Sequence, residues 1–135
     1  MSIKTKVENI KDDLDFFEDE LQKYEYIIDL GKKLDSLDDK YKTAENIVHG
    51  CTSQVWLISE EKDGKLYFKG TSDAIIVKGL IYIILEIFSG EEKETLKTVD
   101  MDIIYELGLS EVITPNRQSG VIGMIKKIKE IAQKG

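Results

Sequence analysis

Cys51 is the residue of this sequence best suited to chemistry, because it is the only cysteine and lies close to the only histidine and the only tryptophan. His49 precedes it by two residues, Gly50 precedes it directly, and Trp56 follows in a run that turns abruptly apolar. Glycine adopts backbone conformations closed to other residues, and the hydroxyl residues that follow the thiol can direct hydrogen-bond donors at a thiolate. This pattern predicts a reactive thiol on a loop at the start of a strand.

A lone cysteine leaves other roles open. It cannot close an internal disulfide, and burial in the core is the common fate of an isolated thiol. Zinc and iron–sulfur centres normally take four ligands rich in cysteine and histidine, and this chain offers one of each, so we predict no metal site. Two further alternatives remain: an independent enzyme with a cysteine nucleophile paired to His49, and an interaction module whose thiol is incidental.

Composition favours a soluble chain with a protein or small-molecule partner. The 135 residues suit a single domain over 1–135, and a hydrophobic content of 41% can supply its core. The formal net charge of -7 argues against a nucleic-acid partner, because binding to phosphates needs clustered Lys and Arg. The sequence contains neither a signal-peptide core nor about 20 uninterrupted apolar residues, so we expect a cytoplasmic protein with no membrane partner.

Apolar periodicity predicts the helical elements that precede this thiol. Residues 7–34 carry apolar side chains at steps of three and four, which predicts a helix with Phe17 and Leu21 on its interior face. Gly31 marks a point where this helix bends or a second helix ends. Acidic residues on the opposite side are interpreted as a solvated surface: Asp12, Asp13, Asp15, Glu18, Asp19 and Glu20. Residues 35–45 are polar and aperiodic and predict a connecting loop.

Two stretches after Cys51 predict an antiparallel hairpin. Residues 54–59 and 66–70 are rich in β-forming side chains, and the Asp-Gly pair at residues 63–64 favours a tight turn between them. Residues 47–48 are a candidate for a short third strand. The predicted thiol therefore enters a small sheet directly.

A long apolar run after the hairpin predicts a central helix. Ser72 supplies an oxygen able to cap a helix that begins at Asp73 and runs to about Ser89, where Gly90 can end it in a left-handed conformation. Nearly every face of this run is apolar, which is typical of a helix buried on all sides. The length of the run favours a helix over a strand.

Three more helices are predicted in the C-terminal part. Residues 91–97 and 101–107 predict short ones, and Gly108 closes the second. Thr-Pro-Asn at residues 114–116 predicts the start of an amphipathic helix that runs to about Gln133. Together the elements predict an α+β fold in which a small antiparallel sheet packs against several helices.

Three separated stretches carry motifs that coincide with those of a known family. The first reads Val-His-Gly-Cys at residues 48–51 and then Ser-Gln-Val-Trp at residues 53–56. The second reads Ser-Asp-Ala-Ile-Ile-Val-Lys-Gly-Leu at residues 72–80, and the third reads Thr-Pro-Asn-Arg-Gln-Ser-Gly at residues 114–120. Over about residues 10–132 the chain resembles the SufE/CsdE sulfur-acceptor proteins of bacterial iron–sulfur cluster assembly.

The resemblance implies a SufE-like fold and a defined role for Cys51. Members take sulfur as a persulfide from a pyridoxal-phosphate cysteine desulfurase, stimulate that enzyme and pass the sulfur to an iron–sulfur scaffold protein. The chain would then be an accessory protein, not an enzyme, and would hold no cofactor, because the pyridoxal phosphate belongs to the desulfurase. Six further residues are expected to shape the loop or contact the partner: Gly50, Ser53, Gln54, Asp73, Lys78 and Arg117.

Several of these residues also have simpler structural interpretations. Asp73 suits a helix cap, Lys78 a solvated charge on a helix, and Arg117, the only arginine, a salt bridge at a helix start. His49 falls at a position that the family motif leaves variable, which argues against a catalytic role for it. The resemblance therefore gives more weight to Gly50 and to the residues after the thiol than to the histidine.

Overall fold

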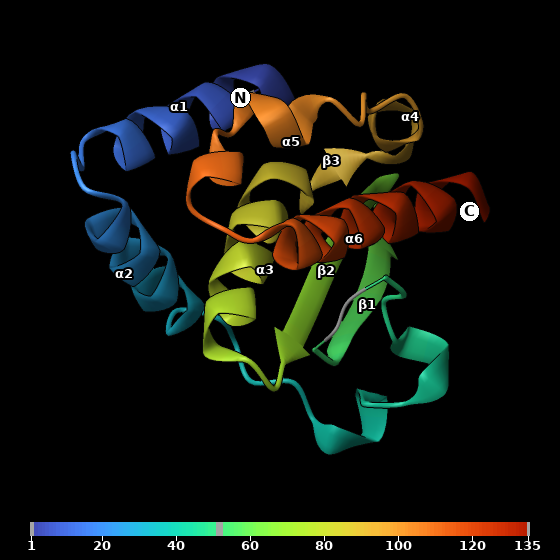
Figure 1. Ribbon diagram of the computed structural model, residues 1–135. Helices are drawn as coiled ribbons and strands as arrows, with labels where there is room; N and C mark the ends of the chain where they lie inside the picture. Colours follow the sequence, from blue (N-terminus) through green and yellow to red (C-terminus); the bar gives the residue numbers. More distant parts are fainter. Residues whose placement is uncertain (1, 51–52, 135) are drawn as a thin grey trace.

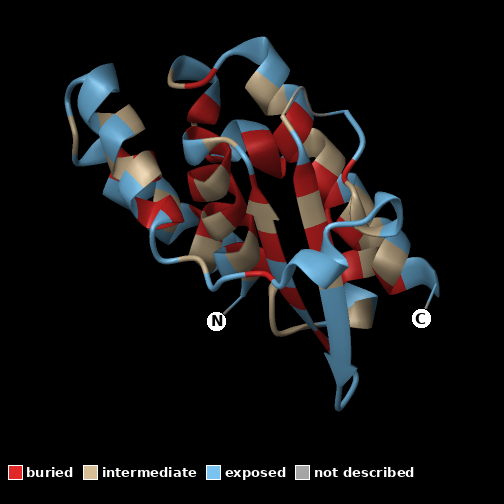
Figure 2. Cartoon of the chain, turned by 90° about the horizontal axis from the view of Figure 1, so that it is seen from below, coloured by how far each residue is buried: buried red, intermediate tan, exposed pale blue. Residues whose placement is uncertain are grey.

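The computed structural model describes residues 2–50 and 53–134, which form an α+β fold (Figure 1). Within these ranges a three-stranded antiparallel sheet, in the order β1-β2-β3, packs against helices α1 to α6. Buried residues concentrate where the sheet meets the central helices, whereas the tip of the hairpin is exposed (Figure 2). This architecture confirms the predicted fold class.

The predicted hairpin forms and is longer than the sequence indicated. β1 (Val55–Lys62) pairs antiparallel with β2 (Lys65–Ser72) along the full length of both strands. Asp63 and Gly64 have φ angles of 54° and 79°, the left-handed pair that a two-residue hairpin turn requires. Alternate residues of β2 are buried, so one face of the sheet lies against the helices.

The third strand occurs where a helix was predicted. β3 (Glu91–Glu92) pairs with Lys65 and Leu66 of β2, and α4 (Lys93–Lys97) begins only after it. The prediction of one helix from residue 91 is therefore wrong at its start. Gly90, with φ 85°, turns the chain, and its N–H donates to the carbonyl oxygen of Leu66 at 2.7 Å. That hydrogen bond brings the following residues alongside β2.

The N-terminal helix predicted over residues 7–34 is two helices. α1 (Ile3–Asp15) and α2 (Glu20–Gly31) are separated by a short turn. The carboxylate of Asp19 accepts the N–H of Leu21 at 2.7 Å, so it caps α2 and begins a new helix. Leu21, predicted to face the interior, is 62% exposed as a consequence.

The central helix α3 (Ile75–Phe88) forms as predicted and begins two residues after the predicted start at Asp73. The oxygen Oγ of Ser72 accepts the N–H of Ala74 at 3.2 Å and therefore organises the turn before the helix, not its first turn. Gly79 of α3 packs directly on Gly31 of α2: a Cβ added at Gly31 would lie 2.7 Å from the backbone nitrogen of Gly79. The backbones of α2 and α3 therefore contact each other where the two helices cross.

The remaining elements follow the sequence closely. The loop predicted over residues 35–45 contains two 3-10 turns, η1 (Asp39–Tyr41) and η2 (Ala44–Asn46). α5 (Ile103–Glu106) is shorter than predicted and is followed by Gly108, which has φ 72° and leads into η3 (Leu109–Glu111). The last helix, α6 (Pro115–Lys134), begins at the predicted proline and packs against α3 and α4. None of these helices, within the described ranges, is long and apolar enough to cross a membrane.

Candidate functional site

Cys51, the predicted reactive thiol, lies outside the residues that the structure describes, so the site is built from its flanks. Gly50 and Ser53 are the described residues on either side of it. A Cβ added at Gly50, which has φ 92°, would lie 3.7 Å from the carbonyl oxygen of Ser119. Ser53 shares a small crevice with Arg117. Both flanks therefore approach the first two turns of α6.

The segment that leads to Gly50 is attached to the start of β1. The N–H of Val48 donates to the carbonyl oxygen of Val55 at 2.8 Å, and Ile47 forms an isolated antiparallel bridge with Trp56. The short third strand proposed at residues 47–48 is therefore reduced to a bridge. The bridge and the hydrogen bond still hold residues 47–48 beside the first residues of β1.

The same segment also packs against α6. A Cβ added at Gly123 would collide with the carbonyl oxygen of His49, so only glycine permits this approach. The contact made by His49 is thus a backbone contact, and the residue as a whole is exposed. Val48, its neighbour, is 3% exposed and anchors the segment in the core.

The segment that follows Ser53 is held by a cluster of hydrogen bonds at Gln54. Ser72 Oγ donates to the carbonyl oxygen of Gln54 at 2.6 Å, and the N–H of Gln54 donates to Oδ1 of Asp73 at 3.1 Å. Ser72 is only 5% exposed, so its hydroxyl is a buried structural group. Asp73 therefore connects the start of β1 to the turn before α3 and is not the helix cap that was the alternative.

An apolar crevice lies beside Ser53, beneath the start of α6. Its volume is about 10 Å³, and it is lined by Ser53, Val77, Leu80, Asn116, Arg117, Gly120 and Met124. Val77, Leu80 and Met124 are buried, so the floor is apolar, whereas the rim carries polar side chains. A cavity of this size holds about one water-sized atom.

Arg117 supplies positive charge at the rim of the crevice. The backbone N–H of Arg117 donates to Oγ1 of Thr114 at 3.4 Å, so the threonine side chain caps the first turn of α6. Within residues 2–50 and 53–134 its guanidinium makes no ion pair, so the salt bridge considered as the alternative role is absent there. The guanidinium and the positive end of α6 act on the same side of the site.

Lys78 lies apart from this crevice. It lines a separate groove of about 480 Å³ between α2 and α3, together with residues that include Ile28, Leu34 and Ile75. The structure thus brings Gly50, Ser53, Gln54, Asp73 and Arg117 to one place and leaves Lys78 on another surface. Their proposed roles stay predictions.

Two residues of the site were missed from the sequence. Ser72 was interpreted only as a helix cap, although it also secures Gln54. Gly123 lies in the interior of α6, and a glycine inside a helix costs about 1 kcal/mol relative to alanine, so it calls for a packing reason. That signal was available before the fold was known.

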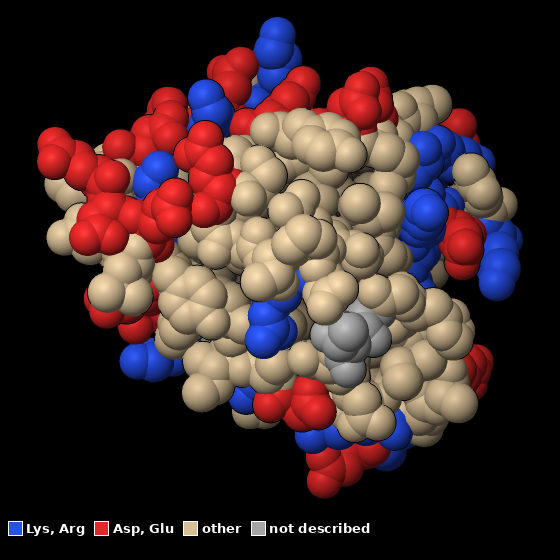
Figure 3. Space-filling view, in the orientation of Figure 1, with Lys and Arg blue, Asp and Glu red and all other residues tan. Residues whose placement is uncertain are grey.

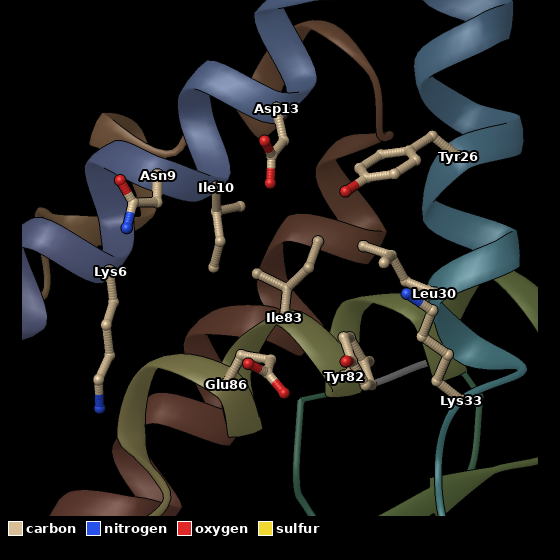
Figure 4. Close-up of a pocket in the computed structure, with 10 residues that line it drawn as sticks. All are labelled: Lys6, Asn9, Ile10, Asp13, Tyr26, Leu30, Lys33, Tyr82, Ile83 and Glu86. Atoms are coloured by element: carbon tan, nitrogen blue, oxygen red, sulfur yellow. The ribbon is translucent and has the colours of Figure 1, made fainter. Parts of the chain in front are cut away.

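A third hollow, a cleft of about 280 Å³, is formed by α1, α2 and α3 and contains none of the predicted site residues (Figure 4). Burial raises the pKa of the Tyr26 and Tyr82 phenols, and the carboxylates of Asp13 and Glu86, respectively, raise it further. Both phenols are therefore protonated at neutral pH.

Across the described part of the chain, no group of three or more His, Cys, Asp or Glu residues is arranged to hold a metal ion.

Several known proteins are similar to this chain in sequence. A family model described as "SufE: Fe-S metabolism associated domain" matches residues 8–132. An uncharacterized SufE-like protein of Rhizobium meliloti (strain 1021) is 40% identical over 134 residues, with 96% of each chain covered. Another, from Rhizobium etli, is 37% identical over 132 residues, covering 94% of this chain and 89% of the relative.

A solved structure supports the fold independently. The solution structure of a hypothetical protein from Thermus thermophilus superposes with a TM-score of 0.78 and covers 96% of this chain and 94% of its own. The identity is 19%, so this similarity concerns the fold alone.

Proposed function

The chain belongs to the SufE family of Fe-S metabolism associated domains, and from this premise we propose that it is a persulfide carrier that uses Cys51. In this proposal a pyridoxal-phosphate cysteine desulfurase loads the thiol, and an iron–sulfur scaffold protein takes the sulfur from it. The chain stimulates the desulfurase and contributes no cofactor of its own. Such a thiol works in a reducing compartment, which favours the cytoplasm.

The transfer step is a thiol exchange at sulfur. The Cys51 thiolate attacks the outer sulfur of the desulfurase persulfide, a new S–S bond forms at Cys51, and the old S–S bond breaks. The desulfurase cysteine leaves as a thiolate, and the outer sulfur keeps its proton. No electrons are gained or lost overall, so the step needs no oxidant. Delivery to the scaffold repeats the exchange with a scaffold thiolate as the attacking group.

The observation that carries the proposal is the approach of both flanks of Cys51 to the first turns of α6. Ser53 shares its crevice with Arg117, and Gly50 lies near Ser119. The N-terminus of a helix and a guanidinium both favour an anion, and both lower the pKa of a nearby thiol. A larger thiolate fraction at neutral pH makes attack on a persulfide faster.

The crevice supports a second requirement of a carrier. An exposed persulfide or thiolate is oxidised in steps, so the loaded sulfur needs shelter between two encounters. The crevice beside Ser53 has an apolar floor and a volume of about 10 Å³, which is enough for one water-sized atom. We propose that it receives the terminal sulfur.

Mass spectrometry of the intact protein tests this function. After incubation with the cognate desulfurase and cysteine, we expect an added sulfur on Cys51 and faster desulfurase turnover. Cys51→Ser should abolish both effects while leaving the fold unchanged, and Arg117→Ala should slow the loading. An unmodified Cys51 together with unchanged desulfurase turnover would sink the carrier hypothesis. Turnover of a substrate by the chain without any desulfurase would favour an independent enzyme instead.

A further inference from the structure

The turn between α1 and α2 presents apolar side chains to solvent. Phe16, the residue after α1, is 80% exposed, and Leu21, in the first turn of α2, is 62% exposed. We call residues 12–21 the acidic tip. It contributes no residue to the crevice beside Ser53 or to the hydrogen bonds at Gln54.

The exposure of Leu21 follows from the helix break. In a continuous helix the apolar spacing would bury Leu21 on the same face as Leu14, which is 3% exposed. The cap at Asp19 redirects α2 and releases Leu21 from the core. Apolar side chains that form an exposed patch commonly mark an interaction site.

The two aromatic residues of the tip, Phe16 and Phe17, contact each other and α2 before any partner arrives. The Phe16 and Phe17 rings are packed edge to face, with 5.3 Å between their ring centres. The Phe17 ring packs against the ring of Tyr26 of α2, with 5.1 Å between their centres. Ordered aromatic side chains lose little conformational entropy on binding and are favoured anchors of protein interfaces. Phe16 has a neighbouring ring to rest on and is 80% exposed, so most of its side chain is open to a partner.

The charge around these side chains has a single sign. Residues 12–22 contain no Lys or Arg and carry six exposed acidic residues: Asp12, Asp13, Asp15, Glu18, Asp19 and Glu20. Acidic side chains visibly gather over this end of α1 and α2 (Figure 3). Among residues 2–50 and 53–134 this group makes one ion pair, between Lys11 and Asp15, which is long, at 3.8 Å, and both side chains are more than half exposed. The field of the tip is thus largely uncompensated.

We propose that the acidic tip docks a basic, amphipathic segment of another protein, whose apolar residues cover Phe16 and Leu21 while its Lys or Arg side chains meet the carboxylates. The role goes beyond sulfur transfer, because the tip is separate from the flanks of Cys51 and both surfaces can be occupied together. Charge decides the chemistry of the partner: nucleic acid and anionic membranes are repelled by the same carboxylates that attract a basic segment.

A second copy of this chain is a poorer partner than another protein. The long basic helix that such a copy could offer is α6, where two of the lysines are engaged within the chain. Lys127 Nζ donates to the carbonyl oxygen of Glu45 at 3.2 Å, and Lys129 Nζ donates to that of Val99 at 2.7 Å. Docking these side chains on the acidic tip would break those hydrogen bonds.

The test uses the full chain and a synthetic helix as the probe. The ¹⁵N-labelled protein is titrated with a peptide that has leucine along one face and lysine on the other. We expect amide shifts concentrated at the acidic tip, and weaker binding as salt rises and screens the charges. Phe16→Ser with Leu21→Ser keeps every charge and should weaken binding by about tenfold or more, because the apolar burial is lost. Tyr105→Ser, at a side chain 64% exposed elsewhere, is the matched control and should bind as the parent does.

Each other outcome overturns the proposal. Shifts spread over all acidic surfaces, or equal binding by the double variant, would reduce the tip to a solvated charge cluster. Equal binding of a leucine–glutamate helix would remove the role of charge. A self-associating parent chain that becomes monomeric in the double variant would assign the tip to a second copy. Binding to vesicles of anionic lipid would assign it to a membrane.

Discussion

Two glycines let helix backbones approach other chain segments at close range, and they do so in regions of opposite character. Gly79 of α3 meets α2 inside the core, where Ile27 is fully buried. Gly123 of α6 meets the carbonyl oxygen of His49, an exposed residue in a turn. The first contact joins two rigid helices, and the second joins one helix to the segment that leads to Cys51. A close backbone approach at a glycine therefore stabilises the core at Gly79 and positions the segment before Cys51 at Gly123.

The two regions also differ in what holds them together. At the α2–α3 crossing the helices are fixed by apolar packing along both lengths, so no single side chain carries the contact. The flanks of Cys51 are held by the buried side chain of Val48 and by a few hydrogen bonds, chiefly those of Val48 and Gln54. One hydrogen bond contributes about 0.5 to 1.5 kcal/mol net. Disturbing the crossing should therefore destabilise the whole chain, whereas disturbing the flanks should displace the site at little cost in stability.

Gly79→Ala tests the core contact and should have the largest effect. Its Cβ would collide with the backbone of Ile27, and neither helix can move without opening the core. We expect the free energy of unfolding to fall by about 3 kcal/mol, at the upper end of typical overpacking costs. Urea unfolding measures it, and Lys78→Ala on the same turn is the control. A loss below about 1 kcal/mol would mean that α2 and α3 adjust more freely than their packing indicates.

Gly123→Ala makes the same change at the edge of the site. Its Cβ would push His49 and, through it, Gly50 away from α6, and these two residues are exposed and can yield. We expect a stability loss of about 1 kcal/mol, because the displaced segment is not enclosed, together with clearly slower persulfide loading of Cys51. Unfolding curves and desulfurase-dependent loading separate the two effects, and Lys126→Ala is an exposed control on α6. Unchanged loading would show that the position of His49 does not control the thiol.

The contrast between the two regions also explains which features the sequence could predict. The hairpin, the central helix and α6 follow from local patterns: an Asp-Gly turn, an apolar run and a Thr-Pro start. The break at Asp19 did not follow, because the apolar spacing continues across it and favours one helix. β3 did not follow either, since two glutamates form a strand there only because Gly90 bonds to Leu66 of a distant element.

The candidate site was partly predictable for the same reason. Motif residues such as Gly50, Ser53, Asp73 and Arg117 could be identified one by one, but their grouping around α6 and Gln54 depends on contacts between segments far apart in sequence. Lys78 belongs to the same motif as Asp73 but lines another groove. The two residues are five positions apart at the start of a helix, and side chains at that spacing point in different directions. Adjacency in a motif does not imply adjacency in space.

Ser72→Ala should give the smallest effect and tests whether hydrogen bonds alone fix the flank after the thiol. The variant loses the 2.6 Å bond to the carbonyl oxygen of Gln54 and the bond from the N–H of Ala74. Gln54 is exposed, so water can replace part of the loss, and we expect the chain to be destabilised by about 0.5 kcal/mol, the lower end of the net worth of a hydrogen bond. Hydrogen exchange at Gln54 should rise more than exchange in α3, because the opening is local. Ser72→Thr keeps the hydroxyl and should retain the protection; equal protection in Ser72→Ala would assign the flank to packing, as at the α2–α3 crossing.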